Sequence, residues 1–215
     1  MKEKVTLIVT SCGRFDLLRR TLTSLFHFNK YPFYNILVNE DSGKMIDLSD
    51  MPREFEIDRG IYLSNKQGQA KALDTLLRQC KTKFYFSLED DWEFYRGDFI
   101  EQSLDIMTAD KSVHHVWVRD PNDHRHPLKD ITTINGVRVR EVTKNYIKTW
   151  GGFSHNPGLK RLSDYKRMFP NGFQEFKDEL ACNNHAMKFD YKAVSLVEHA
   201  CKHIGWGKHT PNFVP

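Results

Sequence analysis

The segment FYFSLEDDW, residues 84–92, decides how this chain folds. Its apolar beginning predicts a buried β-strand, and the acids Glu89, Asp90 and Asp91 follow at the carboxyl end of that strand. In an open α/β sheet, ligands bind in the crevice outside the carboxyl ends of the strands. Adjacent carboxylates repel one another, so three in a row indicate a cation or a basic partner. The alternative is a solvated acidic turn.

The composition is that of an ordinary globular chain. A length of 215 residues predicts one α/β domain or two small ones. The 40% hydrophobic and 13% aromatic content supports a packed core and argues against disorder. The formal charge of +4 suits anionic ligands such as nucleotides without singling out nucleic acid.

The sequence also bears on where the protein works. No apolar stretch approaches membrane-spanning length, and residues 1–5 lack the apolar core of a signal peptide. The four cysteines form no CxxC pair, which is simplest to interpret as reduced thiols. We therefore expect a soluble cytoplasmic protein, with no obligate protein partner evident.

The first half of the chain alternates strands and helices. Strands are predicted at residues 5–10, 35–39, 61–63 and 83–88, and helices at 14–27 and 67–79. This β-α-β-β-α-β order predicts a mainly parallel, doubly wound sheet with helices on both faces. Polar residues follow three of the strands, and one crevice would bring them together.

The second half has a different character. Helices are predicted at 98–107, 156–168 and 173–188, strands at 116–118, 137–142 and 193–197, and a loop or flap at 119–135. Neither an internal repeat nor a flexible linker interrupts the chain. We therefore predict a single α/β domain over residues 1–215.

Six segments, in this order, resemble the nucleotide-sugar-dependent glycosyltransferases of the GT-A fold, especially the family-2-like group. They are TSCGRFDLLRRTLTSL (10–25), VNEDSG (38–43), NKQGQAKALDTLL (65–77), FYFSLEDDWEF (84–94), WGGFSHNPGLKRLSDY (150–165) and EHACKHIGWGKH (198–209). The resemblance implies a GT-A (Rossmann-like) domain. Residues 1–95 would form its nucleotide-sugar-binding half and residues 96–215 its acceptor-binding half.

The acids of residues 89–91 resemble the DxD motif of this family, with Glu89 in place of the first Asp. The resemblance implies that Asp91 ligates a metal ion while Glu89 and Asp90 approach the ribose or the sugar. A divalent cation stabilises a departing diphosphate as a Lewis acid, and carboxylates suit Mn²⁺ and Mg²⁺.

The resemblance also implies that His203, in a His-Ile-Gly element near the C-terminus, completes the metal site. An imidazole ligand would favour Mn²⁺ over Mg²⁺. One alternative is an ordinary histidine, since the chain has ten. Another is a zinc site with His199 and His209, but Cys201 lies between them at no standard finger spacing.

Two other strand ends suit an anionic donor. Ser11 and Arg14 lie where the first predicted strand meets its helix, whose backbone N–H groups favour anions. The guanidinium fork of Arg14 suits phosphate, although a solvated helix charge fits equally well. By the resemblance, Glu40 or Asp41 hydrogen-bonds the nucleoside; the alternative is a turn-forming acid before Ser-Gly.

The segment from Gln67 to Lys71 resembles the family loop that packs on the base and the diphosphate. The resemblance places Gln67 in this loop and turns Lys71 toward the phosphates. Gly68 would let the backbone approach the ligand closely, although a plain helix N-terminus explains this glycine nearly as well.

An inverting transfer needs a general base, which in this family is a carboxylate at the start of a late helix. Glu175, Asp178 and Glu179 compete for this role. We favour Glu179, because its distance from the turn at 189–191 resembles the family spacing, with Glu175 second. All three also fit an exposed helix face.

Aromatic residues are candidates for the acceptor side. Trp92, Trp150 and Phe153 would stack on a sugar or a base, and Gly151 belongs to the same glycine-rich element as the latter two. Aromatic side chains more often belong to a core, but the Trp-Gly-Gly-Phe run is too glycine-rich for a core strand.

The resemblance implies a metal-dependent, inverting glycosyltransferase that uses a UDP-sugar or a related donor. Its acceptor would be a glycan or a modified base in DNA, for which the loop at 119–130 is a candidate contact. The main alternative is a catalytically inactive module of the same fold that binds nucleic acid or a protein partner. A nucleotidyltransferase is disfavoured, because no glycine-rich basic loop follows the first strand.

Overall fold

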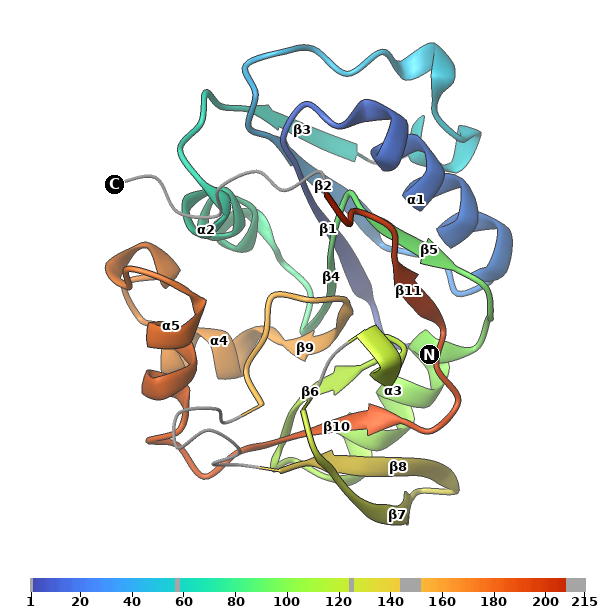
Figure 1. The fold of residues 1–215 in the computed structure, drawn as a ribbon, viewed down its shortest axis with the longest axis vertical. Helices are drawn as coiled ribbons and strands as arrows, with labels where there is room; N and C mark the ends of the chain where they lie inside the picture. The colour runs from blue at the N-terminus through green and yellow to red at the C-terminus, as the bar shows by residue number, and fades with distance from the viewer. Residues whose placement is uncertain (1, 57–58, 124–125, 144–151, 208–215) are drawn as a thin grey trace.

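A nine-stranded mixed sheet organises the computed structural model, which describes residues 2–56, 59–123, 126–143 and 152–207 (Figure 1). Its strand order is β3-β2-β1-β4-β9-β6-β10-β8-β7, and β5 and β11 form a separate two-stranded ribbon. The strands are β1 (Val5–Ser11), β2 (Asn35–Glu40), β3 (Arg59–Leu63), β4 (Phe84–Glu89), β5 (Trp92–Phe94), β6 (Val113–Trp117), β7 (Leu128–Ile134), β8 (Val137–Val142), β9 (Gly158–Arg161), β10 (Lys192–Leu196) and β11 (Cys201–His203).

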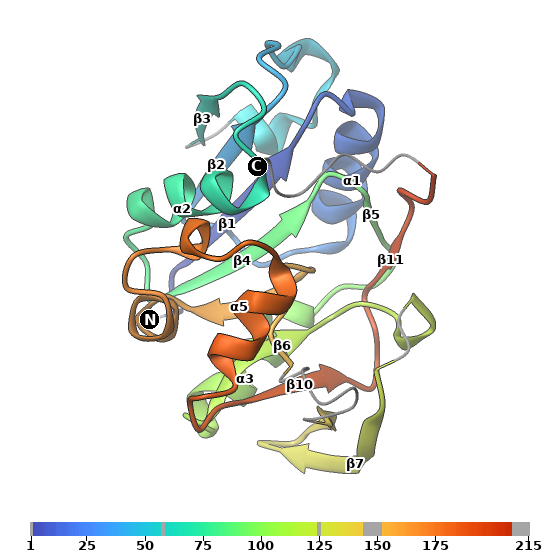
Figure 2. The same cartoon turned by 60° about the vertical axis from the view of Figure 1, so that its left-hand side comes forward.

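Helices cover both faces of this sheet, as predicted (Figures 1 and 2). They are α1 (Phe15–Phe28), α2 (Gln69–Gln79), α3 (Phe99–Ala109), α4 (Leu162–Met168) and α5 (Glu179–Ala186), with 3-10 turns η1 (Leu48–Asp50), η2 (Arg53–Glu56), η3 (Pro121–Asp123) and η4 (Phe173–Glu175). Alternate residues of a strand point to opposite faces. Accordingly, Leu7 of β1 packs in one core with α1 and α3, and Ile8 packs in a second core with α2, α4 and α5.

The parallel sheet predicted for the first half of the chain is confirmed. Strand β1 pairs in parallel with β2 and β4, and β2 pairs in parallel with β3. These strands are apolar almost throughout because the sheet is buried on both faces. The ends of β1, β2 and β4, with their polar residues, therefore meet at one edge.

The second half joins the sheet differently from the prediction. A helix was expected from Asn156, but β9 runs antiparallel between β4 and β6, and α4 begins only at Leu162. Gly158 lets this strand enter, because a Cβ there would lie 2.3 Å from the carbonyl oxygen of Val116. The complete sheet is consequently mixed, with parallel pairs in its first half and between β6 and β10.

The expected loop at 119–135 contains strand β7, which forms a hairpin with β8. Its turn is Asn135-Gly136, and both residues have positive φ, 47° and 80°. A type I′ turn requires this conformation at both central positions, and Asn-Gly is a strong signal for it. The prediction missed the strand because Pro, Asp and His dominate the preceding residues.

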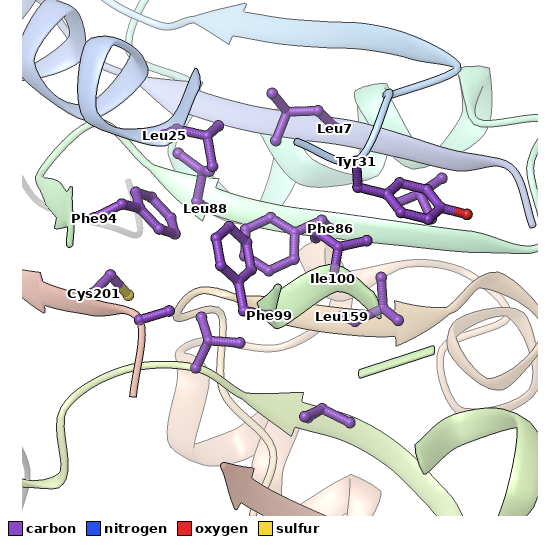
Figure 3. Packing of buried hydrophobic residues seen from close by; sticks show 14 of the residues in the cluster. Leu7, Leu25, Tyr31, Phe86, Leu88, Phe94, Phe99, Ile100, Leu159 and Cys201 are labelled. Atoms are coloured by element: carbon purple, nitrogen blue, oxygen red, sulfur yellow. The ribbon is translucent and has the colours of Figure 1, made fainter. Parts of the chain in front are cut away.

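The β5–β11 ribbon is anchored in the core by its inward side chains. Phe94 of β5 stacks on Phe99 with ring centroids 5.2 Å apart, and Phe86 lies 5.4 Å from Phe99. Figure 3 shows these rings gathered together, with Cys201 of β11 near them. Because the ribbon is fixed in this way, residues at its ends have defined positions over the sheet edge.

None of the helices in the described ranges combines the length and the apolar character that crossing a bilayer requires.

Candidate active site

A pocket opens at the carboxyl ends of β1, β2 and β4, where the prediction placed it. Residues from across the whole chain line it, from the first strand to the C-terminal ribbon. Those predicted from the sequence are Ser11, Arg14, Asp41, Glu89, Asp90, Asp91, Trp92, Glu179 and His203. Those not predicted are Thr10, Cys12, Gln69, Ala72 and Asn156.

Asp90 is fully buried and is held by the turn between β1 and α1. Arg14 forms an ion pair with its Oδ1, and Ser11 Oγ donates to its Oδ2 at 3.0 Å. Burial raises the pKa of Asp90 to about 6, although the charge of Arg14 acts in the opposite direction. The Asp90 side chain therefore fixes Arg14 at the start of α1, which explains why a basic and an acidic residue occur at these two strand ends.

Asp91 is the acid on which the pocket converges. Its Oδ2 accepts a hydrogen bond from Arg14 Nη1 at 2.8 Å and lies 3.2 Å from His203 Nε2. Burial acts to raise the pKa of Asp91, but the hydrogen bond from His203 and the charge of Arg14 outweigh it and hold the pKa below its ordinary value. Asp91 is consequently an anion at neutral pH.

The pairing of β5 with β11 brings His203 to this position. His203 lies opposite Trp92 in the antiparallel register, and its backbone N–H donates to Asp123 Oδ2 at 2.8 Å. The next residues of the His-Ile-Gly element also contact Asp91: the N–H of Ile204 donates to the Asp91 carbonyl at 2.9 Å. Two segments far apart in sequence thus form one small unit.

Asp91 and His203 together fit a divalent ion. They offer a carboxylate oxygen and an imidazole nitrogen, which is a donor set that Mn²⁺ accepts. Within the described ranges, no group of three or more His, Cys, Asp or Glu side chains is arranged to hold a metal. Two protein ligands are enough for an ion that takes its remaining ligands from substrate phosphates and water.

Glu89 and Trp92 are engaged with each other. Glu89 accepts one hydrogen bond from Gln69 Nε2 at 2.9 Å and another from Trp92 Nε1 at 2.8 Å. Burial and then the charge of Asp91 raise the pKa of Glu89. The indole ring of Trp92 is 1% exposed and forms part of the pocket wall. Gln69 was not predicted as a site residue, although it lies in one of the segments that carried the resemblance.

The two acids at the end of β2 have different roles. Glu40 accepts the backbone N–H groups of Gly13 at 2.9 Å and Ser42 at 2.8 Å, and it does not line the pocket. Asp41 lines the pocket and accepts the N–H groups of Gln67 at 2.9 Å and Gly68 at 2.7 Å. Asp41 thus fixes the turn that opens α2. Lys71, further along this helix, is exposed and does not line the pocket.

The structure separates the three candidate bases. Glu179 is the first residue of α5, lines the pocket and accepts the backbone N–H of His155 at 3.0 Å. Asp178 caps the same helix by accepting the N–H of Ala181 at 2.7 Å. Glu175 is exposed in η4. Burial raises the pKa of Glu179, while the hydrogen bond from His155 acts to lower it.

The predicted acceptor-side residues lie in two kinds of place. Phe153 is buried in the second core, with ring centroids 5.2 Å from Phe169 and 5.5 Å from Phe173. Trp150 and Gly151 lie outside the described residues, as does His209. Asn156 lines the pocket and was not predicted as a site residue, although it lies in the segment 150–165 that contributed to the resemblance.

Comparisons with known proteins agree with this architecture. The model of the family described as Glycosyl transferase family 2 matches residues 6–167. A search of curated proteins found no match.

Two solved structures share the fold at low sequence identity. The mannosyltransferase PcManGT from Pyrobaculum calidifontis, in complex with GDP-Man and Mn²⁺, is 16% identical with a TM-score of 0.66 over 97% of this chain. S. aureus TarS 1–349, in complex with UDP-GlcNAc, is 13% identical with a TM-score of 0.63, also over 97% of this chain. The chain spans 59% of the PcManGT chain and 60% of the TarS 1–349 chain.

Proposed function

Because this chain belongs to glycosyl transferase family 2, we propose that it transfers a sugar from a nucleoside diphosphate sugar to an acceptor hydroxyl. The observation that carries the proposal is the meeting of Asp91, His203 and Glu179 in one pocket, from three distant parts of the chain. A donor-side group and a candidate base thereby face the same space. Residues 1–95 would serve the donor and residues 96–215 the acceptor, with the protein working in the cytoplasm.

The donor diphosphate would lie at the start of α1. Backbone N–H groups at a helix start and the fork of Arg14 attract an anion there, while Ser11 shapes the same turn. Asp41 and the turn at 67–68 would contact the nucleoside, and Glu89 and Asp90 would lie toward the ribose or the sugar. We propose that the donor is a UDP-sugar. The competing hypothesis is a GDP-sugar, because PcManGT was solved in complex with GDP-Man.

Asp91 and His203 would hold the Mn²⁺ or Mg²⁺ ion. When bound, the ion supplies Lewis-acid stabilisation of the negative charge that develops on the leaving diphosphate. The depressed pKa of Asp91 keeps its carboxylate ionised for this role. Arg14 donates a hydrogen bond to Asp91 Oδ2, so it would contribute positive charge next to the leaving group.

Glu179 would accept the proton of the acceptor hydroxyl as that oxygen attacks the anomeric carbon. Direct attack on the face opposite the leaving group inverts the configuration. The position of Glu179 in the pocket supports it over Glu175, which is exposed. The acceptor would be a glycan or a modified base in DNA.

The test is transfer from UDP- and GDP-sugars, with and without Mn²⁺, to glycan and modified-DNA acceptors. Glu179→Gln should lower kcat about 100-fold or more, the usual effect of removing a general base. Glu175→Gln is the matched control and should leave kcat close to that of the wild type. Asp91→Asn should abolish stimulation by Mn²⁺, whereas His199→Gln should not.

Absence of turnover with every donor, combined with salt-sensitive binding of polynucleotide that Mn²⁺ does not affect, would instead support an inactive binding module.

A further inference from the structure

A lysine lies buried beneath the pocket. Lys160, on β9 at the centre of the sheet, is 7% exposed. Within the described ranges, no carboxylate lies within ion-pair distance of its ammonium group, which donates to Ser87 Oγ at 2.6 Å and to the carbonyl of Asn156 at 3.2 Å. Burying a cation without an adjacent anion is costly, so its retention at this position calls for an explanation.

A turn formed by residues 154–156 connects this lysine to Glu179. Asn156 of this turn lines the pocket. Glu179 accepts the N–H of His155 at 3.0 Å on one side of the turn, while Lys160 donates to the carbonyl of Asn156 on the other. Within the turn, the N–H of Asn156 donates to Ser154 Oγ at 3.1 Å. Lys160 and Glu179 therefore hold the turn between them.

Charged groups from several elements act on Glu179. The cations are Lys160 of β9 and Arg119. The guanidinium carbon of Arg119 lies 5.0 Å from the ring centroid of Trp92, and its guanidinium group donates to the carbonyl of Asp123. On the other side, Glu89 of β4 carries a like charge. On α5 itself, Asp178 is occupied as the helix cap and Cys182 is a buried thiol. Lys160 is thus the cation that shares a structural unit with Glu179.

We propose that Lys160 is a positioning residue for Glu179: it fixes the 154–156 turn that hydrogen-bonds this carboxylate, and it adds positive charge that favours the ionised carboxylate. This inference rests on the proposed role of Glu179 as the base. It adds a residue that never touches the substrate but sets the pH range over which the base works.

The direction of the pKa shifts agrees with this geometry. Burial lowers the pKa of Lys160 to about 7, and the charges of Glu89 and Glu179 act against that fall. Burial raises the pKa of Glu179, and Lys160 acts to lower it. As the pH falls below 7, Lys160 becomes fully charged. Its charge therefore stabilises the ionised form of Glu179 most at the pH values where Glu179 begins to bind a proton.

The direct test is to measure the pKa of the Glu179 carboxyl by ¹³C NMR titration of glutamate-labelled protein. The signal of Glu179 is assigned by its absence in the E179Q variant. Lys160→Met should raise this pKa by about one unit or more, the usual effect of losing an opposite charge nearby. Lys160→Arg should restore most of the difference. Lys166→Met, which removes an exposed lysine of α4, should leave the pKa unchanged. An unchanged Glu179 pKa in folded Lys160→Met protein would overturn the proposal.

A reciprocal measurement covers the case in which Lys160→Met does not fold. Two coupled groups shift each other's titration equally, so Glu179→Gln should lower the pKa of Lys160, read from its ¹³Cε shift. An unchanged Lys160 pKa would also overturn the proposal. Neither NMR measurement requires turnover, so this inference can fail or stand independently of the proposed transferase activity.

If the protein is active, kcat/KM of both proteins should fall as the pH is lowered. The midpoint of this fall should lie about one pH unit higher in Lys160→Met than in the wild type. A loss of activity that is equal at all pH values would mean that Lys160 serves the fold alone.

Discussion

Gly205 lies directly against Asp91: a Cβ at position 205 would come within 2.2 Å of Asp91 Oδ2. No side chain fits there unless the carboxylate moves. The glycine two residues after His203 is therefore required by the position of Asp91, and the His-Ile-Gly element acts as one unit around this acid.

Gly205→Ala should displace the Asp91 carboxylate and weaken binding of Mn²⁺ in the presence of UDP by about 10- to 100-fold, as changes that misorient a ligand do. Isothermal titration calorimetry measures this affinity. Gly207→Ala is the matched control, since position 207 has a φ of +81° but no atom within 4 Å of its Cβ. Equal effects of the two substitutions would show that the loss does not come from the contact with Asp91.

Arg14→Lys should weaken UDP binding at least about tenfold. Arg14 contacts Asp90 through one part of its guanidinium and Asp91 through another, and an ammonium group does not reproduce this fork. The loss of charged hydrogen bonds is usually worth about 1.5–3 kcal/mol. Arg19→Lys, on the exposed side of the same helix, should bind UDP as the wild type does. Comparable affinities of both variants for UDP would contradict this role of Arg14.

Asp74→Ala should lower the free energy of unfolding by about 2–4 kcal/mol, measured by urea denaturation. Asp74 accepts Tyr165 Oη at 2.8 Å and the N–H groups of Phe173 at 2.9 Å and Gln174 at 3.0 Å, and it thereby joins α2 to η4. Its removal leaves buried donors unsatisfied. Asp105→Ala, at an exposed position of α3, should change the free energy of unfolding by less than about 0.5 kcal/mol.

Stability should fall on the acid side of pH 6.5 because of a buried histidine. Burial, and then the charge of Lys160, lower the pKa of His155 from 6.5 to about 3. The unfolded chain therefore binds a proton below pH 6.5 that the folded protein does not bind until about pH 3. Each such histidine costs about 1.4 kcal/mol per pH unit in this window.

His155→Phe removes one of these protons and suits the aromatic neighbours of the ring, Phe153 and Phe173. Between pH 6 and 4, the free energy of unfolding of this variant should fall less steeply with decreasing pH than that of the wild type. The difference in slope should be about 1.4 kcal/mol per pH unit. Parallel pH dependences in urea denaturation would show that His155 is not the group responsible.

The sequence predicted the features that depend on neighbouring residues. The apolar run at 84–88 and the alternation of strands and helices up to that point are local patterns, and the parallel order of β1, β2 and β4 follows from them. The acids of residues 89–91 were expected at a strand end, and they line the pocket there.

Other features depended on which distant segments come together. Strand β9 was missed because its residues have no strand pattern of their own, and it exists only because β4 and β6 offer edges on both sides. The buried charge of Lys160 gave no sequence signal, since a lysine in a short apolar segment looks like any exposed lysine.

The chain by itself therefore determined the fold class and the chemical character of the pocket, since periodicity and strand-end residues are properties of consecutive positions. Tertiary structure alone decided that Lys160 lies beneath the turn that holds Glu179, and it separated Glu179, which lines the pocket, from Glu175, which is exposed. Hydrogen bonding and burial set these relationships, and both depend on residues from other parts of the sequence that only the folded chain brings within reach.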